Sequence, residues 1–231
     1  MKIAIIPARG GSKRIPRKNI KPFAGIPMIA RSIRTAQESG CFDRIVVSTD
    51  DEEIAEVARA EGAEVPFLRP AELSDDYTPT VPVVAHALKF LLNDTPRIED
   101  ACCIYATAPF MRSQDLIEAC SLAVRSGADY VFAATDFPFP IQRAIRLDQN
   151  GEVSMFQPEH MTTRSQDLEQ AYHDAGQFYW GRKEAWLTGK PIFSSNSRVH
   201  LMPRFRVQDI DTPEDWEQAE LMLSLIEKRK A

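Results

Sequence analysis

The 231-residue sequence predicts an α/β fold, a mostly parallel sheet flanked by helices. Short apolar runs of strand length alternate with amphipathic helical segments at intervals of roughly 20 residues, which is the pattern of βαβ units. The composition, 44% hydrophobic and 26% charged, is typical of a globular chain. The alternation breaks once, near Phe137, and this break predicts a small inserted β-hairpin subdomain.

In the first half of the chain, Pro27 stands where a helix can begin and Gly40 where it ends. Thr49–Asp51 provides capping side chains for a second helix, which Gly62 stops. Apolar, β-branched runs predict strands at residues 3–7, 44–48 and, more briefly, 64–67.

Beyond a proline-rich loop at 68–82, the pattern predicts a helix at 83–92, a buried strand at 101–105 and a helix from the capping residue Ser113 to Gly127. A strand follows at 130–134. The Asn150–Gly151 pair predicts the turn of a hairpin within 144–156, and the inserted segment spans approximately 138–170. Residues 177–180 return to the core, and Thr212 caps a final helix with Pro213 at its first position.

Length and composition favour a single domain over residues 1–231. No secretory signal or membrane-spanning run is visible, so we expect a cytoplasmic protein without a membrane partner. The four cysteines, which lack metal-binding spacing, are expected to be buried free thiols. A pI of about 5.5 argues against nucleic acid as a partner.

Charge is distributed unevenly along the chain. The first 37 residues hold nine Lys or Arg and no acid, so with 28 basic and 33 acidic residues in total the remainder carries 19 against 33, or −14. Five of these cations follow the first strand and are expected to converge on one small region: Arg9, Lys13, Arg14, Arg17 and Lys18. Their loop is opened by Gly10 and Gly11, and its backbone N–H groups and cations together suit phosphate oxygens. The loop therefore predicts a polyphosphate site, although a solvated basic loop is the alternative.

Two familiar phosphate-binding motifs do not fit this loop. A Walker A motif requires a glycine directly before the lysine, whereas Ser12 precedes Lys13 here. A GxGxxG fingerprint cannot be read from Gly10 and Gly11, which disfavours an NAD-dependent oxidoreductase.

A second candidate site is the pair Asp209 and Asp211. In extended chain their side chains point the same way, and two neighbouring carboxylates favour a cation between them. Mg²⁺ takes one or two protein carboxylates together with water and phosphate oxygens. From spacing alone, helix capping by one aspartate is an equal alternative.

The stretch Ile6–Lys13, followed by Pro16, Lys18–Asn19 and Lys21–Pro22, resembles the opening of the CMP-sialic acid synthetase family, and the similarity extends from Ile3 to the last helix. The resemblance implies a Rossmann-like fold of the nucleotide-diphospho-sugar transferase type and cytidylyl transfer from CTP to an acidic nine-carbon sugar. It implies that Asp209 and Asp211 bind Mg²⁺, and that the hairpin segment serves dimerisation, giving a homodimer, and sugar binding.

The same resemblance assigns the nucleotide site. It implies that Arg9, Lys13 and Asp211 are catalytic, with Lys13 beside the charge that develops at the α-phosphate, while either aspartate is an open candidate for the base. The residues expected to contact the nucleotide are Ala8, Arg9, Gly10, Gly11, Ser12, Lys13, Lys18, Asn19, Arg69 and Thr80. Asp75 and Asp76 lie in the expected base loop, with turn formation as the alternative. The sequence does not distinguish cytosine from uracil.

The sugar segment separates members of the family. Arg164, Gln166, His173 and Asp174 lie in a pattern, T-R-x-Q-D-L…Y-H-D-A-G, similar to that of members that activate pseudaminic acid for bacterial surface glycans. Members that activate N-acetylneuraminic acid more usually have an Asn-Gly pair near this point, and they have a Gln-Pro pair in the loop where this chain reads Tyr105–Ala106–Thr107–Ala108–Pro109, so pseudaminic acid is favoured. N-acetylneuraminic, legionaminic or another ulosonic acid is the alternative, and a non-catalytic nucleotide-binding protein is a remote one.

Overall fold

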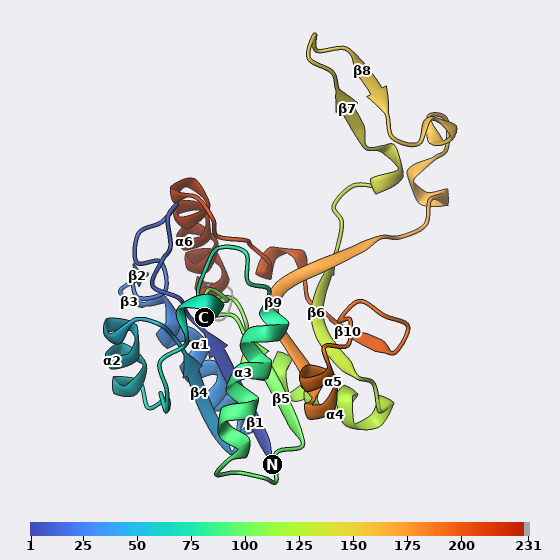
Figure 1. Ribbon diagram of the computed structural model, residues 1–231. Helices are drawn as coiled ribbons and strands as arrows, with labels where there is room; N and C mark the ends of the chain where they lie inside the picture. The colour runs from blue at the N-terminus through green and yellow to red at the C-terminus, as the bar shows by residue number, and fades with distance from the viewer. Residues whose placement is uncertain (229–231) are drawn as a thin grey trace.

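The computed structural model describes residues 1–228, and a six-stranded sheet forms its centre (Figure 1). The strands are β1 (Lys2–Pro7), β4 (Arg44–Ser48), β5 (Asp100–Ile104), β6 (Tyr130–Asp136), β9 (Tyr172–Arg182) and β10 (Ser197–Leu201). Their order is β10-β6-β9-β5-β1-β4, and only β9 runs antiparallel to its neighbours. The predicted mostly parallel sheet is therefore confirmed.

Helices cover both faces of the sheet because side chains alternate along each strand. On β1, Ala4 and Ile6 face a core shared with α1 (Met28–Ser39), α2 (Glu52–Ala60) and α4 (Ser113–Ser126). Ile3 and Ile5 face a second core shared with α3 (Thr80–Leu92) and α5 (Lys183–Thr188). All four β1 side chains are fully buried, as expected for a strand covered on both sides.

Several helix ends form as the sequence predicts. The Asp51 carboxylate accepts a hydrogen bond from Ile54 N at 3.1 Å and caps α2. Gly40 and Gly127 adopt left-handed conformations directly after α1 and α4, which glycine does without a Cβ clash. At the other end of the chain, Thr212 and Asp215 cap α6 (Pro213–Lys228) reciprocally through their side chains and backbone N–H groups.

Helix α6 packs outside the sheet on a smaller apolar cluster. Trp216 of α6 meets Phe23 edge to face at 5.2 Å, and Phe23 belongs to the ribbon of β2 (Pro22–Phe23) and β3 (Ile26–Pro27). This cluster holds the end of the chain next to the basic loop.

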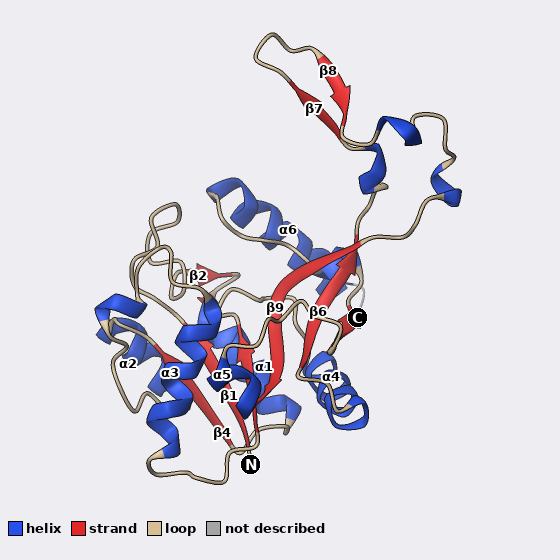
Figure 2. Cartoon of the chain, turned by 45° about the vertical axis from the view of Figure 1, so that its right-hand side comes forward, coloured by secondary structure: helices blue, strands red, loops and turns tan. Residues whose placement is uncertain are grey.

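The predicted hairpin is present as β7 (Ile145–Leu147) and β8 (Val153–Met155), which pair with each other. It lies between β6 and β9 on a projecting arm, residues 137–171, that stands away from the sheet in both views (Figures 1 and 2). At its base, Phe137 N donates to Ala171 O at 3.1 Å, so the arm leaves and re-enters the body at one point.

Two expectations about elements are wrong. Residues 64–67 form no strand. This segment runs beside β4 and the residue after it, and it makes only two isolated bridges, Val46–Glu64 and Thr49–Leu68. Pro66, between the two bridges, has no N–H to donate. Ser113 is the first residue of α4 rather than its cap, and the Asp115 carboxylate accepts from Arg112 N instead.

The pattern also missed α5 and β10, which are short. Short 3-10 helices complete the description, at Ala71–Leu73, Ile141–Arg143, Pro158–His160, Ser165–Asp167 and Arg204–Arg206. Over residues 1–228, no helix combines the length and apolarity that crossing a membrane requires. The four cysteines are free, and three of them are buried.

Candidate functional site

A cleft of about 370 Å³ opens beyond the carboxyl ends of β1 and β5, the edge where parallel sheets commonly bind ligands. The basic loop after β1 forms one wall. The loop before α3 and the first residue of α3 form the other. Among the predicted nucleotide residues, those that line the cleft are Arg9, Ser12, Lys13, Lys18, Asn19, Arg69 and Thr80.

Ala8, Gly10 and Gly11 do not line the cleft but shape its wall. Ala8 N donates to Ser48 O at 2.9 Å, and Gly10 N donates to the Asp50 carboxylate at 3.0 Å. A Cβ on Gly10 would lie 2.6 Å from the Asp51 carboxylate, so packing against the start of α2 requires this glycine. Gly11 has open space around it, and no such contact explains it.

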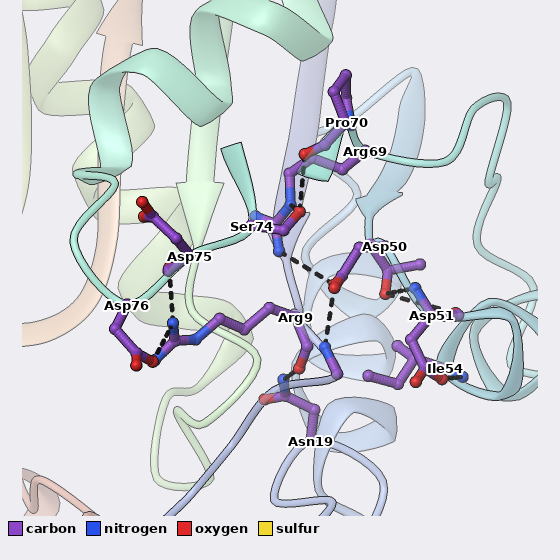
Figure 3. A network of polar contacts seen from close by, with 12 residues as sticks. Arg9, Asn19, Asp50, Asp51, Ile54, Arg69, Pro70, Ser74, Asp75 and Asp76 are labelled. Atoms are coloured by element: carbon purple, nitrogen blue, oxygen red, sulfur yellow. Dashed lines mark hydrogen bonds and ion pairs between the residues drawn. The ribbon is translucent and has the colours of Figure 1, made fainter. Parts of the chain in front are cut away.

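The two leading cations of the loop meet one carboxylate across the cleft, that of Asp76. Arg9 contacts it at 2.7 Å and also donates to Asp75 O at 2.6 Å (Figure 3). Lys13 pairs with the same Asp76 carboxylate. The Asp75 carboxylate instead accepts from Tyr77 N and Thr78 N. Asp75 therefore forms the turn, as the alternative interpretation held, whereas Asp76 faces the basic loop.

Asp211 also lines the cleft. Its carboxylate contacts Arg14 at 2.8 Å and Lys18 at 3.2 Å, and Lys18 also donates to Ile210 O at 2.7 Å. Desolvation raises the pKa of Asp209, and the charge of nearby Asp211 raises it further. Asp211 lines the cleft and Asp209 does not, so a divalent cation at this pair would have to compete with Arg14 and Lys18 for the Asp211 carboxylate.

Asn19 and Arg69 are the most buried polar groups of the cleft. Asn19 donates to Arg9 O at 2.9 Å, which joins the loop to itself. Arg69 is 6% exposed, and burial lowers its pKa despite the charge of Asp50. Its Nε bonds to Ser74 Oγ at 3.2 Å, while its buried Nη2 makes no hydrogen bond among the described residues and faces the Asp50 carboxylate at 3.7 Å. Arg69 therefore brings a largely buried positive charge to the cleft wall, balanced by Asp50.

Thr80 belongs to a chain of hydroxyl groups that sequence reasoning did not anticipate. Its Oγ1 lies 3.0 Å from the Tyr105 hydroxyl, and the Tyr105 ring lies 5.4 Å from that of Tyr179. The Tyr179 hydroxyl donates to Asp174 at 2.5 Å. The Tyr179 side chain therefore separates Asp174 from Tyr105, which lines the cleft. Tyr105 could have been predicted as a site residue, because it directly follows a buried strand that ends at this edge of the sheet.

The other predicted sugar residues do not reach the cleft of this chain. Arg164 and Gln166 lie on the arm, where Arg164 pairs locally with Asp167 at 2.8 Å. His173 lies at the base of the arm, with its ring against Phe137 and its Nδ1 2.9 Å from Asp174 O.

Arg17, expected to add to the converging charge, points elsewhere. It forms two bonds with Asp51, at 2.5 and 2.8 Å, and contacts Glu53. Its φ of +57° lies in the left-handed region, which is unusual for a side chain of this size. Arg17 therefore fixes the loop against α2 and does not line the cleft.

Comparison with known proteins gives the class of this chain. Residues 3–215 match the cytidylyltransferase family, and the chain belongs to it. It is 49% identical to the pseudaminic acid cytidylyltransferase of Campylobacter jejuni (strain 81-176) over 95% of each chain, and 31% identical to the CMP-N,N'-diacetyllegionaminic acid synthase of Legionella pneumophila over 96% of each. These matches confirm the family resemblance.

Solved structures agree on the fold. The structure of CMP:2-keto-3-deoxy-manno-octonic acid synthetase complexed with CTP superposes with a TM-score of 0.71, covering 97% of this chain and 98% of the other. A 4-diphosphocytidyl-2C-methyl-D-erythritol synthase from Anaerococcus prevotii gives 0.64 over 96% and 98%. Sequence identities of 15% and 17% limit this likeness to the fold.

Proposed function

We propose that this protein joins CMP from CTP to pseudaminic acid and releases pyrophosphate. The observation that carries the proposal is the 49% identity to the Campylobacter jejuni pseudaminic acid cytidylyltransferase, maintained over 95% of each chain. The cleft supports it, because Arg9, Lys13, Arg14 and Lys18 surround one small volume at the edge of the sheet.

In this proposal the anomeric hydroxyl of the sugar attacks the α-phosphorus of CTP and the bond to pyrophosphate breaks. Nucleotidyl transfer requires positioning and charge stabilisation more than covalent chemistry from the protein. Arg9, Ser12 and Lys13 hold the triphosphate, with Lys13 beside the α-phosphate, and Lys18 assists. The Lys13 side chain is 80% exposed, so its ammonium group can leave Asp76 for the α-phosphate.

The base end of the nucleotide is assigned to the buried side of the cleft. Arg69 brings its guanidinium to the cleft wall, and Asn19 and Thr80 bring an amide and a hydroxyl. These groups suit the carbonyl and ring edge of a pyrimidine, and the carbonyl of cytosine is the acceptor we assign to Arg69.

We assign Mg²⁺ to Asp209 and Asp211. Within residues 1–228 no group of three or more His, Cys, Asp or Glu side chains is arranged to hold a metal, so the remaining ligands are water and phosphate oxygens. Bound there, Mg²⁺ would neutralise charge on the phosphates and the leaving group. Lys18 and Arg14 contact the Asp211 carboxylate, which lines the cleft.

For the sugar, we propose that Arg164 and Gln166 serve the cleft of a second copy in a homodimer. Asp174 would act on its own cleft through Tyr179 and Tyr105, and His173 would contact the sugar from the base of the arm. The arm exposes Phe139 (79%), Leu147 (66%), Val153 (63%) and Phe156 (61%). So many exposed apolar side chains on a projecting segment are typical of a protein interface. Arg164 would then hold the sugar carboxylate through a paired guanidinium contact.

The substrate is tested by pyrophosphate release from CTP and Mg²⁺ with pseudaminic, N-acetylneuraminic and N,N'-diacetyllegionaminic acids in parallel. We expect release chiefly with pseudaminic acid. Release chiefly with another acid would retain cytidylyl transfer and overturn the sugar assignment.

The shared site is tested by mixing two inactive variants. Lys13→Ala damages the nucleotide cleft and Arg164→Ala the arm, so co-refolded mixtures should regain up to about a quarter of wild-type activity through heterodimers that hold one intact site. A monomer by light scattering, or mixtures as inactive as their components, would contradict the shared site.

A further inference from the structure

The phosphate-binding cations already have an anionic partner within the chain. Asp76 contacts Arg9 at 2.7 Å and also pairs with Lys13, and these are the two residues assigned above to the triphosphate. Both contacts use the donors that a phosphate would need. One donor is the Lys13 ammonium, and the other is an Arg9 nitrogen that also donates to Asp75 O, as Figure 3 shows for Arg9. A carboxylate in this place acts as a stand-in for a phosphate oxygen.

The carboxylate of Asp76 does not hold its own loop together. Within residues 1–228, its hydrogen-bond and ion-pair partners are Arg9 and Lys13 alone. The turn is held by other groups: the Asp75 carboxylate accepts from Tyr77 N at 3.0 Å and from Thr78 N at 2.6 Å, and the Thr78 hydroxyl donates to Glu72 O at 3.3 Å. A substitution at Asp76 therefore removes the anion and leaves the turn.

We infer that Asp76 is an internal competitor for the triphosphate, so that CTP binds only by displacing it from Arg9 and Lys13 and Asp76 thereby lowers the affinity for CTP. The inference rests on the proposed function in one respect, the assignment of these two cations to the triphosphate. The same contact should speed the release of pyrophosphate, because Asp76 returns to Arg9 and Lys13 as the product leaves.

The size of the effect follows from exposure. The Asp76 and Arg9 side chains are about one-third exposed and Lys13 is mostly exposed, so each ion pair is weak. Loss of both should tighten CTP binding by about threefold to tenfold. Cytidine, which has no phosphate, should bind the variant and the wild type equally.

The experiment is calorimetric titration of Mg²⁺ and CTP into wild type, Asp76→Asn and Asp76→Ser. Both substitutions remove the charge, and two chemically different replacements guard against a folding defect in one. Glu72→Gln is the matched control, since it removes one charge from the same loop through an exposed side chain outside the cleft.

Tighter CTP binding in both Asp76 variants, with unchanged affinity in Glu72→Gln, is the expected result. Equal or weaker CTP binding in folded Asp76 variants would overturn the inference and make Asp76 neutral or a contributor to the bound state. Because the readout is CTP affinity, it is independent of the sugar: a wild type that binds CTP but transfers nothing to pseudaminic acid would refute the proposed function alone.

Discussion

Cations and carboxylates in this protein are paired across long stretches of chain. Lys18 reaches Asp211, 193 positions away, and Arg9 and Lys13 reach Asp76. Most of these side chains are partly exposed, so the pairs add little to the free energy of unfolding. Their main effect is to place several charged groups around the cleft.

Lys13→Ala tests that charge at the cleft. Turnover should fall by at least about tenfold, because a loss of 1.4 kcal/mol in transition-state stabilisation is one decade. The side chain is 80% exposed, so the melting temperature should not move. Steady-state pyrophosphate release measures this, with Lys89→Ala, an exposed lysine of α3, as the control. A folded variant with wild-type turnover would remove Lys13 from the mechanism.

A buried counterpart is formed by Asp115, Arg206 and His200. Arg206 donates two hydrogen bonds to the Asp115 carboxylate, at 2.5 and 2.9 Å, and His200 Nε2 lies 3.2 Å from it. Burial alone would raise the pKa of Asp115, but the bonds from His200 and Arg206 outweigh it and hold that pKa well below its ordinary value. The pair anchors the chain shortly before Asp209 and Asp211.

Asp115→Asn leaves the Arg206 charge buried without a counterion and should cost about 3–5 kcal/mol of unfolding free energy at pH 7. The carboxyl group has a lower pKa in the folded state, so its contribution is present above the unfolded pKa of about 3.9 and is lost as pH falls below it. Urea denaturation of both proteins should therefore show a difference that is constant at neutral pH and shrinks below about pH 4. A pH-independent difference would contradict the role of the charge.

At the scale of elements, β9 lies between β6 and β5 and joins the two parts of the sheet. Gly181 on β9 packs so tightly that an added Cβ would lie 2.3 Å from Trp186 Nε1 and 2.7 Å from the Tyr130 ring. Trp186 itself donates to Ala101 O at 3.0 Å, which ties α5 to β5.

Gly181→Ala should therefore lower the unfolding free energy by about 1–3 kcal/mol through overpacking. The site is at the end of β9 away from the cleft, so CTP affinity should stay unchanged. In the double variant with Trp186→Ala, the total loss should be smaller than the sum of the two single losses, because the clashing ring atoms are gone. Thermal unfolding of the four proteins decides this, and strict additivity would count against the clash.

At the scale of the whole molecule, the arm (residues 137–171) is an insertion into the body, which is formed by the remaining described residues. The arm leaves at Asp136 and returns at Tyr172, neighbours in the β6–β9 register. The three cores of the body contain no buried side chain from residues 137–171. The body should therefore fold without the arm.

Replacement of residues 138–170 by Asn-Gly, a pair that favours a two-residue hairpin, tests this separation. We expect a folded monomer that binds CTP with wild-type affinity and has lost transfer to the sugar. Light scattering, calorimetry and pyrophosphate release measure the three properties. Retained dimerisation would place the interface on the body, and retained transfer would remove Arg164 and Gln166 from the site.

The sequence by itself determined two kinds of feature: secondary-structure elements, which depend on neighbouring residues, and the family, which depends on a contiguous motif. Apolar runs and caps predicted β1, β4, β5 and β6 and most helices, because burial pattern and end chemistry are properties of neighbouring residues. The glycine pair and basic loop predicted an anion site, and the motif around them predicted the family, since both are contiguous in the chain.

Only the tertiary structure decided which distant groups meet. The antiparallel entry of β9 between β5 and β6, the pairing of Asp76 with Arg9 and Lys13, and the burial of Arg206 against Asp115 join residues tens of positions apart. The physical reason is that charge pairing and strand order depend on position in space, which side-chain periodicity does not encode. Arg17 illustrates this: its sequence neighbours predicted a place in the cleft, but contact with Asp51 turned it toward α2.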